Sequence, residues 1–306
     1  MDFIGKNLLN KVSGLLDIPT SGAFNIRANG ESAARSTSEN IDIVTKSDKP
    51  GINIIIKPST KGESVHIPVI VSESGLKDTV YNDFYIGENC DVTIVAGCGI
   101  HNCGSADSEH DGVHRFFVGK NAKVRYIEKH YGEGEGRGKR LMNPASEVTL
   151  DEGAEMDMET TQIAGIDDTF RKTTAKLAAH SILTIHEKVM TTGEQHADSY
   201  FSADLNGEEC SCNIVSRTVA KDNSVQNFTS VLNGNAACAG HTECDSIIMD
   251  NARVLASPQL CAACVDASLI HEAAIGKIAG EQLIKLMTLG LTEQEAEEQI
   301  VNGFLK

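Results

Sequence analysis

The chain has 306 residues, a formal net charge of −16 and a sequence pI near 5.0, and 41% of its residues are hydrophobic. This length supports one or two domains with a sizeable core. The acidic excess argues against nucleic acid and anionic membranes as partners, and no apolar run reaches the roughly 18 residues of a membrane-spanning helix.

The nine cysteines are an odd number, and the N-terminal segment lacks the continuous apolar centre and small-residue cleavage site of a secretory signal. Thiols in a chain without an export signal are expected to stay reduced. The sequence therefore predicts a cytoplasmic protein without a disulfide framework.

An N-terminal subdomain is predicted over residues 1–80. Residues 3–16 carry an apolar stripe typical of a short amphipathic helix. Residues 21–40 are rich in small and polar residues and are expected to form turns and loop. Residues 52–57 and 65–71 have the Val- and Ile-rich composition of strands.

A short theme repeats over residues 81–270, in which apolar residues, a polar turn and a small residue precede alternating apolar positions. The small residues Cys90, Ala122 and Ala154 are each 32 positions apart. Later, Ala236 and Ala252 are 16 positions apart, which predicts a shorter coil. A fixed period with turn residues at one offset is typical of a solenoid.

The sequence therefore predicts a mainly β protein whose core is a parallel β-helix, or β-solenoid, and an antiparallel sandwich is the alternative. The glycine-rich segment 131–140 is expected to be a mobile loop. It also lacks a P-loop, since Arg140 follows Lys139 where Ser or Thr is needed. No ATP site is therefore predicted.

Residues 271–306 are predicted to form a pair of helices. Apolar residues fall at helical spacing over 273–289, and Gly290 is suited to end that helix. Thr292 and Glu295 have the spacing of a capping box that begins a second helix.

Cys244 and the adjacent pair His271 and Glu272 carry metal-ligand chemistry near the C-terminus. Thiolates are the usual ligands of iron–sulfur clusters, and an imidazole or carboxylate ligand in their place weakens or alters the binding of the cluster. From the residues alone, a buried cysteine and a helix-capping histidine are the simpler interpretation.

Cys98, His101 and Cys103 form a secondary candidate metal set, beside His110 and His114. Their spacing suits zinc or iron, and a polar loop with satisfied histidines is the equal alternative. We hypothesise that this segment helps to receive sulfur or iron.

Cys261 and Cys264 form a single C-x-x-C pair without a second such pair, which argues against a zinc ribbon. A 16-residue coil places Cys261 beside Asp245 and Cys264 in the interior on Ile248.

Several fixed points in the last quarter of the chain match one family. They are Cys244–Ser246, Pro258, His271–Ala273, Gly276–Ile278, Glu281–Leu283 and Ile300–Phe304. In these elements the chain resembles the SufB/SufD scaffold proteins of iron–sulfur cluster assembly, although it is short for that family. The resemblance implies a right-handed parallel β-helix and a transient iron–sulfur cluster held by Cys244, His271 and Glu272 near the interface of two subunits.

The resemblance also implies the partners. They are a second scaffold subunit, either the same chain or a related one, and a SufC-like ABC-type ATPase that docks on the C-terminal helices. A sulfur donor and client apoproteins complete the set, and the chain itself is not expected to be an enzyme.

Two other functions are weighed against this expectation. A cofactor-free β-solenoid interaction module would need no metal ligands. A polysaccharide-active β-helix enzyme would need aromatic platforms for sugar rings, but the chain has no Trp and only five Tyr.

Overall fold

The structure is a computed structural model that describes residues 2–306. Its helices are α1 (Phe3–Ser13), α2 (Gly280–Thr288) and α3 (Glu293–Phe304). Its strands are β1 (Ala23–Ala28), β2 (Glu31–Ser36), β3 (Ile41–Thr45), β4 (Gly51–Ile56), β5 (Lys61–Val71), β6 (Lys77–Ile86), β7 (Asp91–His101), β8 (Ser108–Val118), β9 (Lys123–Glu133), β10 (Arg140–Met142), β11 (Ala145–Leu150), β12 (Glu155–Ala164), β13 (Asp168–Leu177), β14 (Ile182–Thr191), β15 (His196–Leu205), β16 (Ser211–Ala220), β17 (Val225–Gly234), β18 (Ala239–Ile248), β19 (Arg253–Ala262) and β20 (Ser268–Gly276).

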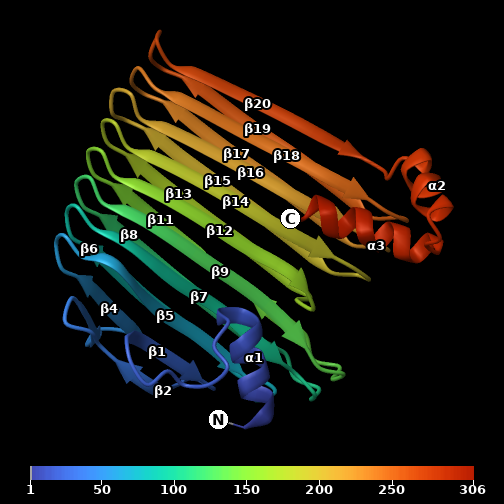
Figure 1. Cartoon of the computed structure of the whole chain (residues 1–306), viewed down its shortest axis with the longest axis horizontal. Coiled ribbons are helices and arrows are strands. Elements are labelled where there is room, and N and C mark those ends of the chain that lie inside the picture. The colour runs from blue at the N-terminus through green and yellow to red at the C-terminus, as the bar shows by residue number, and fades with distance from the viewer. Residues whose placement is uncertain (1) are drawn as a thin grey trace.

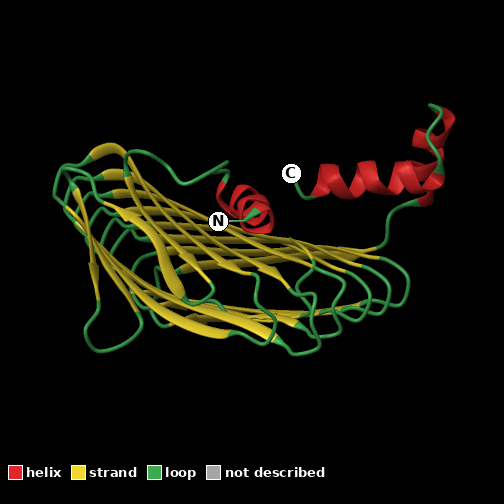
Figure 2. Cartoon of the chain, turned by 90° about the horizontal axis from the view of Figure 1, so that it is seen from below, coloured by secondary structure: helices red, strands yellow, loops and turns green. Residues whose placement is uncertain are grey.

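The strands alternate between two sheets and form a β-solenoid of about eight turns (Figure 1). Sheet A has the order β2-β1-β5-β7-β9-β12-β14-β16-β18-β20, and sheet B runs from β3 and β4 through β6, β8, β10 and β11, β13, β15 and β17 to β19. Figure 2 shows the two sheets as stacked layers. The predicted mainly β solenoid is confirmed, and the antiparallel sandwich is wrong.

The number of residues in each coil follows from the residues that pair on neighbouring strands of one sheet. Asp91 pairs with Lys123 and Lys123 with Glu155, so these coils take 32 residues, as predicted. Ala239 pairs with Ser211 on one side and with Ser268 on the other, so the later coils take 28 and 29 residues. The predicted 16-residue coil is wrong because each coil contains one strand from each sheet.

The repeated theme marks one corner of the solenoid. Asn89 and Asn121 adopt left-handed conformations, with φ of 56° and 55°, which asparagine tolerates better than most residues. The next residue at each corner is small and buried. This column contains Cys90, Ala122, Ala154, Ser181, Cys210 and Cys238. Backbone hydrogen bonds join it from coil to coil, as from Lys123 N to Cys90 O at 2.9 Å.

The N-terminal region continues the sheets. The segment expected to be loop instead forms β1 and β2, an antiparallel pair, and β1 pairs in parallel with β5. The strands expected at 52–57 and 65–71 are confirmed as β4 and β5, which pair with β6 and β7. The domain boundaries near residues 80 and 270 stay predictions, and the sheets run across both.

Helix α1 lies on the outer face of sheet A (Figures 1 and 2). Its apolar stripe buries Leu8, Leu9 and Val12, which confirms the predicted helix. The strand beneath is β7, where a Cβ atom on Gly99 would lie 3.0 Å from the Cβ of Leu8. Glycine in β7 therefore allows the helix to approach closely.

The glycine-rich segment after β9 is held against its neighbour rather than mobile. Gly136 N donates to Asn102 O at 3.1 Å, and Gly138 N donates to Gly104 O at 3.0 Å. A Cβ atom on Gly138 would lie 2.0 Å from Ala106 O. The glycines are needed because two turns pass here in backbone contact.

The C-terminal helices begin later than expected, because residues 273–276 belong to β20. The capping box is confirmed, since Thr292 N donates to Glu295 Oε2 at 2.8 Å and the Thr292 hydroxyl accepts from Glu295 N. Val301 of α3 and Leu305, which follows the helix, pack against Val219 of sheet A, and α2 buries no residue. Over residues 2–306, no helix has both the length and the apolar character to span a membrane.

Candidate functional site

The C-terminal end of the solenoid is open. Strands β19 and β20 are the last of their sheets and pair on one side only. Most of their residues are exposed, and Ile270 keeps 52% of its surface accessible. Within residues 2–306 no helix covers this edge, because α3 lies on the outer face of sheet A (Figure 2).

Cys244 and His271 face the interior at this end. Cys244 is 2% exposed and belongs to the solenoid core. On β20, His271 pairs with Thr242, which lies two positions from Cys244 and shares its inner face. The structure therefore places thiol and imidazole on neighbouring strands of one inner wall, with the imidazole on the outermost strand.

Glu272 points to the opposite face. It pairs with Glu243, and its Oε1 lies 4.0 Å from Nε2 of His241. One ligand atom from each of His241, Glu243 and Glu272 lies within 4.8 Å of the others. The three predicted residues are thus divided between two faces, and Glu272 has partners that the sequence analysis missed. The sequence contains the alternation His241-Thr242-Glu243, which places two possible metal ligands on one face of a strand. Which residue of the next strand they meet depends on the register of β18 against β20.

Burial controls the charge of Cys244. It raises the pKa of this thiol to about 11, the negative charges of Glu187 and Asp245 act in the same direction, and the hydrogen bond with Ser246 opposes them. On the outer face, burial and a hydrogen bond with Asp245 raise the pKa of Glu243. Because metal ligation requires a thiolate, Cys244 must lose its proton when a metal binds.

A row of polar side chains continues inward from Cys244. In sheet A, Cys244 pairs with Ser216, whose hydroxyl donates to Glu187 Oε2 at 2.6 Å. Further along, Arg171 NH1 donates to Glu128 Oε2 at 2.5 Å, and its Nε lies 3.7 Å from Glu187. The interior beneath the site therefore contains paired charges as well as apolar side chains.

The secondary set does not form one centre. Cys98 is buried in an apolar cluster with Val69 and Ile100, and burial raises its pKa well above the ordinary value. His101 and Cys103 lie at the end of β7, where Cys103 is exposed. Across residues 2–306, the one group of three His, Cys, Asp or Glu side chains with metal-binding spacing includes none of these residues.

The predicted neighbours of Cys261 and Cys264 are wrong because the coil is longer than expected. Cys261 is exposed and pairs with Asn233 rather than lying beside Asp245. Cys264 lies in the turn after β19, half-buried, and not on Ile248.

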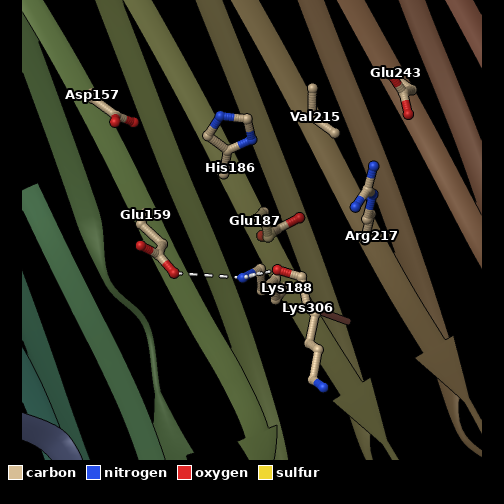
Figure 3. A pocket seen from close by; sticks show the side chains of 9 residues that line it. All are labelled: Asp157, Glu159, His186, Glu187, Lys188, Val215, Arg217, Glu243 and Lys306. Carbon is tan, nitrogen blue, oxygen red and sulfur yellow. Dashed lines mark hydrogen bonds and ion pairs between the residues drawn. The ribbon is translucent and has the colours of Figure 1, made fainter. Parts of the chain in front are cut away.

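A hollow of about 420 Å³ lies on the outer face of sheet A beside the end of α3 (Figure 3). Glu243 is at its margin, so the hollow adjoins the group of His241, Glu243 and Glu272. Lys188 is held by Glu159 at 3.5 Å and by Lys306 O at 3.0 Å. The lining therefore contains both signs of charge, with this lysine already paired.

Fold and site together define a β-solenoid with metal-ligand side chains at an uncapped end. Residues 79–304 match the family described as "SUF system FeS cluster assembly, SufBD core domain". The chain belongs to this family.

Three archaeal relatives agree with this assignment. The chain is 30% identical over 268 residues to the iron-sulfur cluster assembly SufBD family protein MJ0034 of Methanocaldococcus jannaschii, covering 82% of this chain and 79% of that protein. It is 27% identical to a SufBD family protein of Archaeoglobus fulgidus, covering 85% and 70%, and 29% identical to PH0883 of Pyrococcus horikoshii, covering 76% and 69%.

The burial of Cys244 predicts low reactivity in the isolated chain. At pH 8, iodoacetamide should modify Cys244 at least about 100-fold more slowly than an ordinary exposed thiol, since each unit of pKa changes the thiolate fraction tenfold. The rate should rise as the pH approaches the pKa of about 11. Mass spectrometry of the alkylated peptides measures this, with the exposed Cys261 as the internal control. Equal rates for Cys244 and Cys261 at pH 8 would show that Cys244 is accessible.

Proposed function

We propose that this protein is a scaffold on which an iron–sulfur cluster is assembled and from which the cluster passes to client apoproteins. The observation that carries the proposal is the open end of the solenoid, with Cys244 and His271 on its inner wall and Glu272 on its outer face. Cys244 and His271 would hold the cluster transiently as cargo, and Glu272 would bind iron on the outer face beside it. Mixed ligation suits release, because thiolates bind iron–sulfur clusters more strongly than imidazole or carboxylate does.

The scaffold itself is proposed to catalyse no reaction, and assembly is proposed to occur in the cytoplasm with sulfur from a separate donor. Iron entry is proposed at the outer group of His241, Glu243 and Glu272, whose imidazole and carboxylate ligands suit a divalent cation. Binding of iron at Cys244 would then offset the burial that keeps its thiol protonated.

Cluster assembly tests the proposal directly. Anaerobic incubation with Fe(II) and inorganic sulfide should give the wild-type chain a visible iron–sulfur absorbance and bound iron and sulfide. Cys244→Ala should lose most of both signals because it removes the thiolate, and Glu272→Gln should reduce them. Cys261→Ala is the matched control, since it removes an exposed thiol at the same end of the solenoid.

Circular dichroism of each variant checks that the fold is retained. Unchanged absorbance and iron content in both folded variants would contradict the ligand assignment. A wild-type chain that binds neither iron nor sulfide would favour the cofactor-free interaction module.

The open edge is proposed to pair with a second copy of this chain or with a related scaffold subunit. An exposed edge strand with few charges is a template for pairing, and β20 carries no lysine before its end. A two-fold arrangement would use the same surface on both copies. It would bring two sets of Cys244, His271 and Glu272 to a single seam.

An inner-face charge at this edge should prevent pairing. Ile275→Lys places an ammonium group at the open end, opposite Ser246, and should convert a dimer to a monomer. Light scattering after size-exclusion chromatography measures the mass. The control is Val44→Lys, at an exposed position of β3 far along the stack. If Ile275→Lys and the wild-type chain share one dimeric mass, the proposed seam is wrong.

The C-terminal helices are proposed to dock a SufC-like ABC-type ATPase. Helix α2 buries none of its residues, and Ile284 and Leu289 keep 62% and 76% of their surfaces exposed. Helix α3 is anchored on sheet A through Val301 and the half-buried Ile247, which lies three residues from Cys244 in β18. ATP-driven closure of the ATPase pair would therefore act on the strand that carries the thiol.

Charge substitution on α2 tests this docking. Ile284→Asp together with Met287→Asp should abolish co-purification of the ATPase, because carboxylates would have to be buried in an apolar contact. Gln299→Asp, at an exposed polar position of α3, supplies the same kind of charge as a control. Retention of the ATPase by the α2 double variant would place its binding surface elsewhere.

A further inference from the structure

A second hollow, of about 220 Å³, lies between the two sheets at the end of the solenoid remote from β19 and β20 (Figure 1). Strands β1, β2 and β5 of sheet A form one wall, and β4 and β6 of sheet B with the turn at 46–50 form the other. Ile52 and Ile67 of its lining belong to the solenoid core. Ser32 and Arg35 are exposed, so the hollow reaches solvent.

The charge of this lining is opposite to that of the protein as a whole. The chain has 43 Asp and Glu against 27 Lys and Arg, yet no carboxylate among residues 2–306 lines the hollow. Four cationic side chains do, and they are Arg27, Arg35, Lys46 and Lys49. Charges of one sign in a concave site with low-dielectric walls attract an ion of the opposite sign. The hollow is therefore suited to an anion.

Two of the four cations already have a carboxylate partner. Arg27 donates from Nε and NH2 to the two oxygens of Asp78, at 3.0 and 2.8 Å. Burial would raise the pKa of Asp78, but hydrogen bonds with His110 and Arg27 outweigh burial and hold this pKa well below its ordinary value. Lys46 Nζ donates to Asp83 Oδ2 at 2.6 Å. These two cations are neutralised within the chain and leave Arg35 and Lys49 to be considered.

Arg35 and Lys49 have no carboxylate partner among residues 2–306. Arg35 donates from Nε to Asn25 Oδ1 at 2.8 Å and from NH1 to Thr45 Oγ1 at 2.6 Å, and both acceptors are neutral. These contacts fix the guanidinium and leave its NH2 group available to a ligand. Lys49 Nζ lies 4.4 Å from the ring centroid of Tyr81. Two positive charges are thus left without a counter-ion.

The lining also supplies neutral hydrogen-bond donors. Asn25 is 8% exposed, and because its Oδ1 accepts from Arg35, its Nδ2 group remains as the donor for a ligand. Ser32 contributes a hydroxyl from β2, and Thr45 another from the end of β3. Charged and neutral donors therefore reach the hollow from both sheets, which suits a group with several acceptor oxygens.

We propose that this hollow binds a small phosphate monoester, with Arg35 and Lys49 as its charged contacts and Asn25 and Ser32 as neutral donors. A phosphate monoester carries about two negative charges at neutral pH and has three acceptor oxygens. It therefore matches the two unpaired cations and the surrounding donors better than a single carboxylate does.

The size of the hollow agrees with a small molecule rather than an ion alone. Its volume of about 220 Å³ is several times the roughly 30 Å³ that one water molecule occupies in the liquid. The apolar side chains of Ile52, Ile67 and Val80 line the same space and are available to a short organic part of the ligand. None of these residues belongs to the open end with Cys244, so the inference stands apart from the proposed scaffold function.

The first test titrates the full chain with glycerol 3-phosphate in an isothermal calorimeter. The wild-type chain should bind it, and its melting temperature should rise with the ligand concentration. Arg35→Gln should weaken binding about tenfold or more, because it removes a charge-assisted contact. Arg253→Gln is the matched control, since Arg253 is an exposed arginine of β19 at the other end of the solenoid, and it should bind as the wild type does.

A second variant guards against a loss of fold, because Arg35→Gln also removes the bonds to Asn25 and Thr45. Ser32→Glu leaves Arg35 in place and adds a carboxylate to the lining, so it should abolish binding while the circular dichroism spectrum stays unchanged. Acetate at the same ionic strength carries one charge and should bind at least about tenfold more weakly than glycerol 3-phosphate.

Three results would each overturn the proposal. They are a wild-type chain that does not bind glycerol 3-phosphate, undiminished binding in both Arg35→Gln and Ser32→Glu, and acetate binding as tight as that of the phosphate monoester.

Discussion

The in-register stacking of parallel strands is the constraint on which the rest of this structure depends. Each inward position lies on the equivalent position of the next coil, as in the corner column of Cys90, Ala122 and Ala154. Such a stack pairs the backbone groups and buries the side chains of its inner coils. The last strand of each sheet has backbone groups without a partner strand on one side. Cys244 lies on the last strand of sheet A that is paired on both sides, and His271 lies on the first that is not. The metal-ligand side chains are therefore found where the repeating structure ends.

Charged side chains in the interior also affect the protonation of Cys244. Arg171 pairs with Glu128 and approaches Glu187, which also accepts hydrogen bonds from Ser199 and Ser216 at 2.6 Å. Buried charges persist when they are paired and hydrogen-bonded in this way. The charge on Glu187 adds to the effect of burial on Cys244 and favours the neutral thiol. A bound cation would offset both influences, so Cys244 would stay protonated without a metal and would ionise once iron is bound.

The parts of the fold that follow from local chemistry could be predicted from the sequence. The helix at Phe3–Ser13 and the capping box at Thr292 depend on residues close together in the chain, and the 32-residue period is visible because the same turn pattern recurs at a constant offset. The later coils could not be predicted, because their corners differ in length and a spacing of 16 residues imitates half a coil. The glycines at 134–138 predict a mobile loop by composition alone, because the residues that hold them, 102–106, are about 32 positions away in the sequence. The outer partners of Glu272 required the strand register, which the sequence does not contain.

The solenoid gives its thiols two environments that one packed core would not easily provide. Cys103 is exposed, and its Sγ lies 3.0 Å from Nε2 of His101. Cys244 is in the opposite environment, because water and oxidants reach a buried sulfur slowly and burial raises the pKa of its thiol. Alternation along β18 gives Cys244 its buried position, whereas Cys103 is exposed because it lies in the loop after β7. Helices α1 and α3 both lie on the outer face of sheet A. Lys11 of α1 contacts Glu133, which also contacts His101, and α3 packs near β18. Each kind of thiol is thus connected to a different helix on a common face of the solenoid.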